Sequence, residues 1–173
     1  MAAAAISFLT GASMNLFIRK KAYNLLDRYD VLDDTGRLAY TADGLLVRFK
    51  GFLVVRDRAG IELLALKKSP NLLYANYTLT ASEDAGKVLA TMEQQFELRP
   101  AFDIAIGKER LKLRGNLRAC DFEILRDTEP HARIRKRELR WGETYVLSVP
   151  NIQDAPVYCA ITAALDNALF HNR

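Results

Sequence analysis

Short runs of alternating apolar and polar residues recur along almost the whole chain, separated by turn-forming residues roughly every 8 to 12 positions. Such alternation predicts strands with one buried face. The predicted strands cover residues 14–19, 28–32, 37–41, 45–49, 52–56, 61–67, 72–80, 87–93, 102–106, 110–114, 119–125, 132–137 and 144–149. Many short strands at this spacing favour a sandwich or a barrel over units in which strands alternate with helices.

One hairpin unit repeats within this pattern. Residues 31–39, 55–63 and, more loosely, 80–90 each read as a strand, an acidic turn residue, a glycine and a second strand, and residues 125–134 repeat the unit without the glycine. Asp can bond its own backbone in a turn and Gly readily takes positive φ, so the unit predicts a hairpin. The acidic turns lack the closely spaced oxygen ligands of a calcium loop, so no metal site is predicted.

The C-terminal segment has a different pattern. Asp154 can cap a helix, Pro156 is tolerated in a first turn, and residues 157–165 are apolar almost all round. A helix that is apolar on every side is buried on every side. The interior of a closed or nearly closed sheet can surround such a helix, and its small side chains suit a narrow interior. We therefore predict a mostly β fold, a closed antiparallel barrel around a buried apolar C-terminal helix at 155–170.

The 173 residues suit a single domain, predicted at 14–173 after a loosely ordered N-terminal arm at 1–13. The arm is apolar, but no Lys or Arg precedes its apolar stretch, which argues against a signal peptide. The apolar stretch at 155–165 is shorter than the about 20 residues of a membrane span, so no transmembrane segment is predicted. Cys120 and Cys159 both lie in apolar stretches, which predicts buried thiols and a reducing cytoplasm.

Catalytic signatures are missing from the sequence. His131 and His171 have no Ser or Cys partner at a suggestive spacing, and neither a nucleophile elbow nor a phosphate-cradling loop occurs. The neighbouring Asp33 and Asp34 should point apart. Asp166 stands alone in an apolar helix, and we expect it to meet a basic side chain or free backbone donors; a functional carboxylate is the alternative. We predict that the protein is not an enzyme and needs no cofactor.

The most informative feature is a basic outer face. Because strand side chains alternate, Lys108, Arg110, Lys112 and Arg114 should share one face, as should His131, Arg133, Arg135 and Arg137 on a later strand. Between them, Cys120, Phe122 and Ile124 should point inward, and Asp121 and Glu123 outward.

A register can be predicted for these strands. A two-residue turn at Gly115-Asn116 would set Arg110 opposite Asp121 and Lys108 opposite Glu123. A loop over residues 126–130 would set Arg133 beside Glu123 and Arg135 beside Asp121. This register leaves the cations Lys112, Arg114 and Arg137 clustered without a carboxylate between them.

Two interpretations of the face remain open: a solvated surface with cross-strand ion pairs, or a surface for anions. The candidate anion- or lipid-binding residues are Lys108, Arg110, Lys112, Arg114, Arg133, Arg135 and Arg137.

The order of several motifs resembles the LURP-one-related family, within the tubby C-terminal-like and phospholipid-scramblase group. The motifs are residues 16–21 and 29–36, then 134–137, 142–147 and the helix through 164–166. The resemblance implies about twelve strands in the barrel and places Asp166 near one barrel mouth. Tubby-type relatives bind phosphoinositides and scramblase-like relatives are linked to membranes. This chain lacks the cysteine-rich palmitoylation segment and terminal membrane helix of scramblases, so lipid scrambling is not expected.

We therefore expect a non-catalytic binding module that contacts anionic phospholipid or phosphoinositide headgroups, or another polyanion, in the cytoplasm or peripherally at a membrane. The alternative is a protein-interaction or scaffold domain whose basic face is incidental. Nucleic acid is a weaker alternative because exposed aromatics are not interleaved with the cations. An apolar ligand inside the barrel is weaker still, because the helix should fill that space. Trp141 is expected at a barrel rim, either as an interfacial anchor or packed over a loop.

Overall fold

The fold was analysed in a computed structural model, which describes residues 13–23, 26–47, 50–71, 73–139 and 142–170. Apart from residue 13, the predicted arm at 1–13 lies outside these residues, and so does Trp141. The strands are β1 (Met14–Tyr23), β2 (Leu26–Leu32), β3 (Leu38–Leu46), β4 (Gly51–Asp57), β5 (Glu62–Ser69), β6 (Asn76–Ala81), β7 (Val88–Gln94), β8 (Ala101–Ile106), β9 (Glu109–Asn116), β10 (Asp121–Arg126), β11 (Glu129–Leu139) and β12 (Gly142–Val149).

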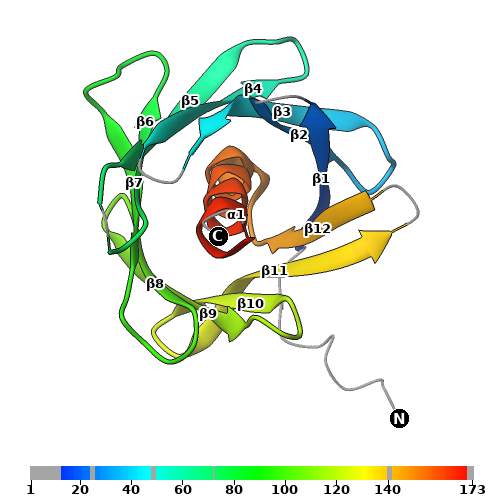
Figure 1. The fold of residues 1–173 in the computed structure, drawn as a ribbon. Coiled ribbons are helices and arrows are strands. Elements are labelled where there is room, and N and C mark those ends of the chain that lie inside the picture. Colours follow the sequence, from blue (N-terminus) through cyan, green and yellow to red (C-terminus); the bar gives the residue numbers. More distant parts are fainter. Residues whose placement is uncertain (1–12, 24–25, 48–49, 72, 140–141, 171–173) are drawn as a thin grey trace.

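The strands form one closed antiparallel barrel. Each strand pairs with its neighbours in sequence, and β1 closes the ring by pairing with β12 (Figure 1). Inward positions alternate with outward ones, so that Leu16 and Ile18 of β1, for example, are almost fully buried. The predicted barrel is confirmed.

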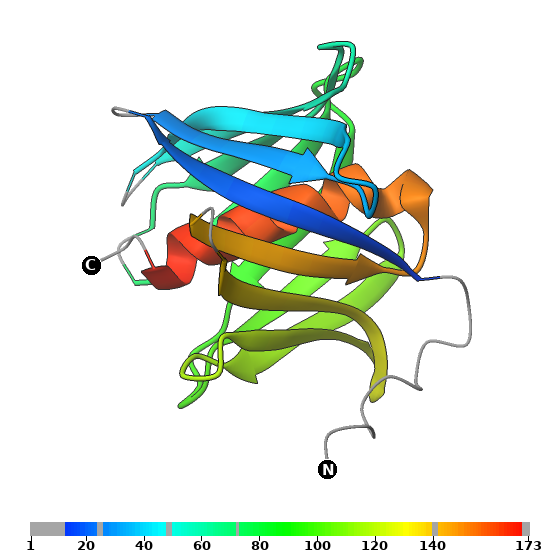
Figure 2. The same cartoon turned by 90° about the vertical axis from the view of Figure 1, so that its right-hand side faces the viewer.

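The interior is filled by helix α1 (Ala155–Phe170), which runs along the barrel axis (Figures 1 and 2). A short 3₁₀ helix, η1 (Ile152–Asp154), precedes it, and the side chain of Asn151 caps η1 by accepting from the Gln153 N–H. Twelve helix residues between Ala155 and Ala168 are buried. The central helix, including its bounds, was therefore predicted correctly, because only a barrel interior removes every side of it from water.

The acidic turns behave as the hairpin repeat predicted. The Asp33 carboxylate accepts hydrogen bonds from the backbone N–H groups of Thr35 and Arg37, and Asp57 repeats this arrangement two strands later. Gly36 has a φ of +79°, the left-handed conformation that the turn requires. These turns connect even-numbered strands to odd-numbered ones, at the end where β12 leads into α1; we call this end the helix-start mouth.

The remaining hairpin connections, from odd-numbered to even-numbered strands, lie at the opposite end, where α1 terminates; we call it the helix-end mouth (Figure 2). Two predicted strands there, 37–41 and 45–49, are a single strand, β3. The turn comes later, where the Val47 N–H bonds the Lys50 carbonyl, and Phe49 lies outside the described residues. The predicted strand at 72–80 begins only at Asn76, because the Asn71 side chain holds a loop by accepting from Leu73 N–H.

The turn predicted at Gly115-Asn116 was wrong. Both residues belong to β9, and the turn is the four-residue segment 117–120. Gly115 is needed inside the strand because a Cβ there would lie 2.2 Å from the Phe122 ring. Asn116 instead starts the turn, accepting from the Arg118 and Ala119 N–H groups. Cys120 therefore has a φ of +50° and lies half-buried in the turn, not on the inner face as predicted.

Candidate functional site

The predicted basic face runs over the outside of β9, β10 and β11. With the turn at 117–120, Arg114 faces Glu123 and Lys112 faces Leu125 across the β9–β10 pair, which corrects the predicted partners of Lys108 and Arg110. On the other side of β10, Arg133 faces Glu123 and Arg135 faces Asp121, as predicted. This second register survives although the loop is shorter, because a bulge at Ile124/Leu125 compensates.

Most of these cations have a carboxylate in contact with them or opposite them on a neighbouring strand. Arg133 forms a two-pronged contact with Asp121, whose first bond, from Nε to Oδ1, is 2.8 Å. Arg114 lies 3.7 Å from Glu97, and Lys112 faces Asp103 across the β8–β9 pair. Lys112 and Arg114 are separated from Arg137 by β10 and its carboxylates. The predicted cluster of these three cations was therefore wrong.

Three arginines on β1 and β11 flank β12 on its two sides. Arg19 on β1 and Arg137 on β11 both pair with Thr144, while Arg135 pairs with Val146 one row away. The Nε atoms of Arg19 and Arg135 are buried, and within the described part of the chain neither has a hydrogen-bond partner. Buried guanidinium donors normally have acceptors, so the unsatisfied Nε atoms of Arg19 and Arg135 need an explanation. We refer to these two residues as the arginine pair. We call Arg19, Arg135 and Arg137 the arginine triplet.

Further cations and the carboxylate of Asp30 lie beside the triplet on β1 and β2. Lys21 and Arg28 lie beside it on β1 and β2, and both contact Asp30, with Arg28 Nε 3.7 Å from Oδ1. Asp30 pairs with Arg19 in the register, yet no ion pair joins the two side chains. Five cations thus lie around Asp30 in this area, and a second carboxylate, Asp121, is opposite Arg135 but is engaged by Arg133.

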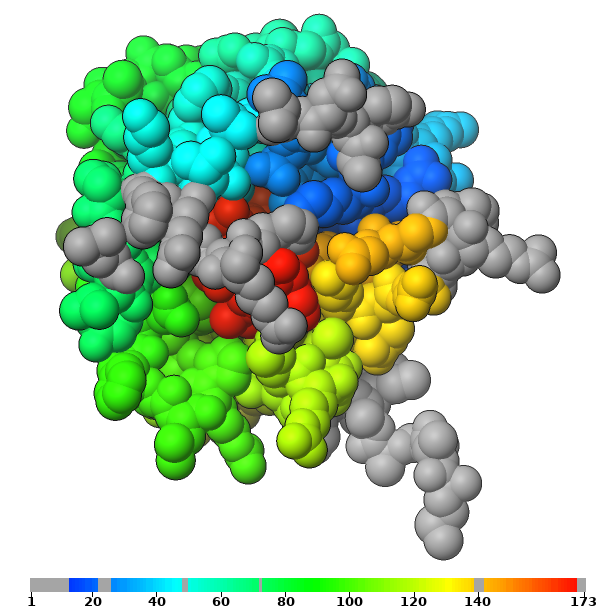
Figure 3. Space-filling view, in the orientation of Figure 1, coloured from blue at the N-terminus to red at the C-terminus, as the bar shows by residue number. Residues whose placement is uncertain are grey.

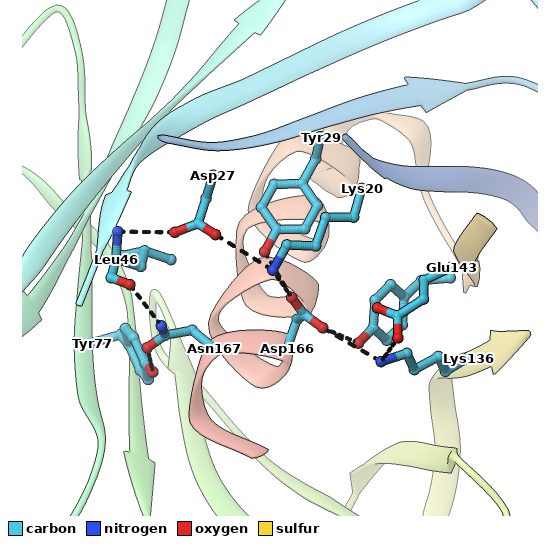
Figure 4. Close-up of polar contacts among 10 residues, drawn as sticks. Lys20, Asp27, Tyr29, Leu46, Tyr77, Lys136, Glu143, Asp166 and Asn167 are labelled. Atoms are coloured by element: carbon cyan, nitrogen blue, oxygen red, sulfur yellow. Dashed lines mark hydrogen bonds and ion pairs between the residues drawn. The ribbon is translucent and has the colours of Figure 1, made fainter. Parts of the chain in front are cut away.

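Inside the helix-end mouth, the Asp166 carboxylate of α1 is fully buried and well partnered (Figure 4). Tyr29 donates to Oδ2 at 2.8 Å and Lys20 at 2.9 Å, while Tyr145 donates to Oδ1. Lys136 is 3.9 Å from Oδ1. The prediction that Asp166 lies near a mouth and meets a basic side chain is confirmed.

Asn167, the next helix residue, is held by the neighbouring strands. Its carbonyl oxygen accepts from Lys68 Nζ and from the Tyr77 hydroxyl, each at 2.8 Å. Its amide nitrogen donates to the Leu46 carbonyl at 3.1 Å (Figure 4). Asp166 and Asn167 thus fasten the end of α1 to seven strands, β1, β2, β3, β5, β6, β11 and β12.

The protonation preferences of this cluster are those of a structural network. Burial, followed by the nearby charge of Asp166, raises the pKa of Tyr29 and of Tyr145, so both stay hydrogen-bond donors. Burial lowers the pKa of Lys68. Within the described residues no three His, Cys, Asp or Glu side chains converge as metal ligands. No catalytic arrangement is indicated.

The inward lysines were missed, although a signal for them existed. Lys20 follows Leu16 and Ile18 at a spacing of two, Lys68 follows Leu64 and Leu66, and Lys136 follows Ala132 and Ile134. Strand alternation places each lysine on the inner face, near the end of its strand at the helix-end mouth. The lysine stems can therefore line the barrel while their ammonium groups meet the acceptors of α1.

The structure also gives the position of His131. His131 is half-buried on β11, with its ring centroid 6.2 Å from that of Tyr158, and burial lowers its pKa. It has no nucleophile partner among the described residues.

Across all the residues that the structure describes, no helix has the length and apolar character to cross a membrane.

Comparisons with known proteins agree on the family. The family model described as LURP-one-related matches residues 14–166. An uncharacterised Bacillus subtilis protein, YxjI, is 20% identical over 160 residues, which cover 92% of this chain and 96% of the relative. The X-ray structure of an Arabidopsis thaliana protein superposes with a TM-score of 0.61 at 15% identity, covering 92% of this chain and 93% of the other. With this barrel and a family match over most of its length, the chain belongs to the LURP-one-related family.

Proposed function

We propose that the protein is a non-catalytic binding module whose outer face binds the phosphate groups of anionic lipid headgroups. The observation that carries the proposal is the arginine pair over β12, whose two buried Nε donors have no acceptor among the described residues. The arginine triplet forms the centre of the site. The remaining cations of the predicted face, from Lys108 to Arg133, lie to one side of it on β11, on β9 and in the turn before β9, and attract anions at longer range.

The chemistry of the pair suits a phosphate. Strands lie about 4.8 Å apart and rise about 3.4 Å per residue, so Arg19 and Arg135, on either side of β12 and offset by one row, project from backbone positions roughly 12 Å from one another. Two guanidinium groups can approach one phosphate from both sides, each with two parallel N–H donors. Without an anion, both charges lie over a strand with unsatisfied donors, which is unfavourable.

The test compares two charge-matched double variants. Arg19→Gln/Arg135→Gln removes the pair, and Arg37→Gln/Arg58→Gln removes two exposed arginines from turns at the helix-start mouth. Each protein is co-sedimented with vesicles of neutral, phosphatidylserine-containing and phosphoinositide-containing lipid at two salt concentrations. Binding of soluble inositol hexakisphosphate is measured by calorimetry, to separate headgroup chemistry from the bilayer.

We expect wild-type binding to anionic vesicles that weakens with added salt. Removing the pair should weaken it by about tenfold or more, at about 1 kcal/mol for each cation near the surface. The control variant should change binding far less. Equal losses in both variants would reduce the effect to net charge. If the wild type binds neither anionic vesicles nor the inositol phosphate, a protein-interaction module is the better description.

A further inference from the structure

Large apolar side chains are exposed around the helix-end mouth. Among the described residues, Leu73 is 79% exposed, Phe96 is 90% exposed and Leu98 is fully exposed. They belong to the loops between β5 and β6 and between β7 and β8. Together with the other exposed apolar side chains of this end they form what we call the apolar rim: Leu26, Leu45, Val47, Phe52, Leu73, Phe96, Leu98 and Leu117.

The residues of the apolar rim lie in or next to five successive hairpin connections. Each connection from β1–β2 to β9–β10 contributes at least one of its residues, within the connection or next to it. The helix-end mouth faces the viewer in Figure 3, where the end of α1 is visible in red inside the ring of strands. The fold does not require these side chains, because the barrel core is already closed by inward residues and α1.

The opposite mouth has a different character. Its turns contain Asp33, Asp34, Asp57, Asp84 and Asp127 together with the exposed cations Arg37, Arg58, Lys87 and Lys108. Among the described residues it exposes fewer large apolar side chains than the helix-end mouth, namely Leu38, Ile61, Val88 and Ile152. Turn chemistry alone would favour the same composition at both mouths. The two ends of the barrel therefore differ in a way that hairpin formation does not explain.

Positive charge accompanies the apolar rim. Lys50, Arg99 and Arg118 are exposed in the connections of this mouth. The arginine triplet lies on the adjoining halves of β1 and β11, since Arg19 and Arg135 are each four residues from the strand end at this mouth. Two carboxylates of this region are engaged by other cations: Glu97 contacts Arg114, and Glu143 contacts Lys136 at 3.1 Å.

We infer that the helix-end mouth is a membrane-docking surface, whose apolar rim enters the interface of a bilayer containing anionic lipid. This inference rests on the proposed function, because it places the arginine triplet at the level of the headgroups. Isolated apolar tips on five separate hairpins suit a deformable lipid surface, and cations beside them complement anionic headgroups. The barrel stands end-on, with its acidic turns directed away from the membrane.

The first experiment uses matched triple variants. Leu73→Ser/Phe96→Ser/Leu98→Ser removes the most exposed part of the rim, and Leu38→Ser/Ile61→Ser/Val88→Ser removes exposed apolar side chains at the helix-start mouth. The rim variant should bind anionic vesicles at least about tenfold more weakly, since buried apolar area drives interfacial binding. It should still bind inositol hexakisphosphate like the wild type. The control variant should match the wild type in both assays.

These outcomes separate the two proposals. Removal of Arg19 and Arg135 should weaken both vesicle and inositol phosphate binding, whereas the rim variant should lose only the former. A rim variant that binds vesicles as well as the wild type overturns the docking surface and leaves the anion site standing. Wild-type protein that binds inositol phosphate but no vesicle also overturns it.

The second experiment locates the inserted end. In a Trp141→Phe background, which removes the chain's one tryptophan, Phe96→Trp and Ile61→Trp place a fluorophore at opposite mouths. Brominated anionic vesicles should quench the first and spare the second. Equal quenching, or quenching only at position 61, would overturn the orientation. Self-association in sedimentation velocity that the rim variant abolishes, without a change in vesicle binding, would assign the mouth to a second copy of this chain.

Discussion

Lys20 and Asp166 are separated by 146 positions, yet their side chains meet inside the barrel with Nζ 2.9 Å from Oδ2. Lys20 is on the first strand and Asp166 is near the end of the final helix. Asp27 lies 3.4 Å from the same ammonium group. The contact therefore joins the two ends of the described chain, and it fixes how far α1 is inserted.

Asp166→Asn should destabilise the protein strongly. Asp166 accepts a hydrogen bond from Lys20 and lies within ion-pair distance of Lys136, and the two lysine side chains are only 13% and 12% exposed. Neutralising it removes the fully buried counter-charge from both ammonium groups, which retain Asp27 and Glu143 beside them. The loss should therefore lie near the lower end of the about 3–5 kcal/mol that breaking a buried pair costs. Urea denaturation measures the loss. Asp34→Asn in an exposed turn is the control and should change stability by less than about 0.5 kcal/mol. A small effect at Asp166 would mean that water reaches the cluster.

Ile161→Asp should prevent cooperative folding. Ile161 is fully buried in α1, so the substitution places an unpaired charge at the barrel axis. Ile61→Asp is a matched control, because that isoleucine is 62% exposed. Soluble yield and thermal melting are the measurements. A soluble Ile161→Asp protein with a sharp melting transition would contradict the position of the helix.

Protonation of His131 should lower stability as the pH falls. Burial, and then the nearby charge of Arg126, lowers the pKa of this imidazole in the folded protein. The unfolded chain therefore binds the proton more tightly, and stability is lost as the pH falls through about 6.5, the ordinary histidine value. Urea denaturation of the wild type and of His131→Gln between pH 8 and pH 5 isolates this effect. Parallel pH profiles for the two proteins would show that His131 does not contribute.

The two thiols should react at different rates. Cys159 is buried in α1 and its pKa is raised by burial, whereas Cys120 is half-buried in the turn at 117–120. Reaction with a thiol reagent requires exposed thiolate, so Cys120 should react first and Cys159 only after unfolding. Mass spectrometry after timed labelling distinguishes them. Rapid native labelling of Cys159 in a Cys120→Ser protein would contradict the buried helix.

The sequence by itself determined the hairpins, the inner and outer faces of the strands, and the central helix. These features depend on local periodicity and turn chemistry, such as Asp33 bonding its own turn or the apolar surface around Ile161. The β10–β11 register was also accessible, because alternation forbids a slip that would turn Arg133 or Arg135 inward.

Only the tertiary structure decided which distant residues meet. Alternation placed Lys20 and Lys136 inside, but barrel closure between β1 and β12 brought both to Asp166. The same closure set Arg19 and Arg135 on either side of β12, although 116 residues separate them (135 minus 19). The β9–β10 register depended on the contact of Gly115 with Phe122, which lengthened the turn and shifted the predicted partners across this strand pair. Local sequence patterns determine which face of a strand is buried. Strand register and barrel closure depend on packing between segments far apart in the chain. The candidate site is built from those long-range contacts, so the sequence alone did not reveal it.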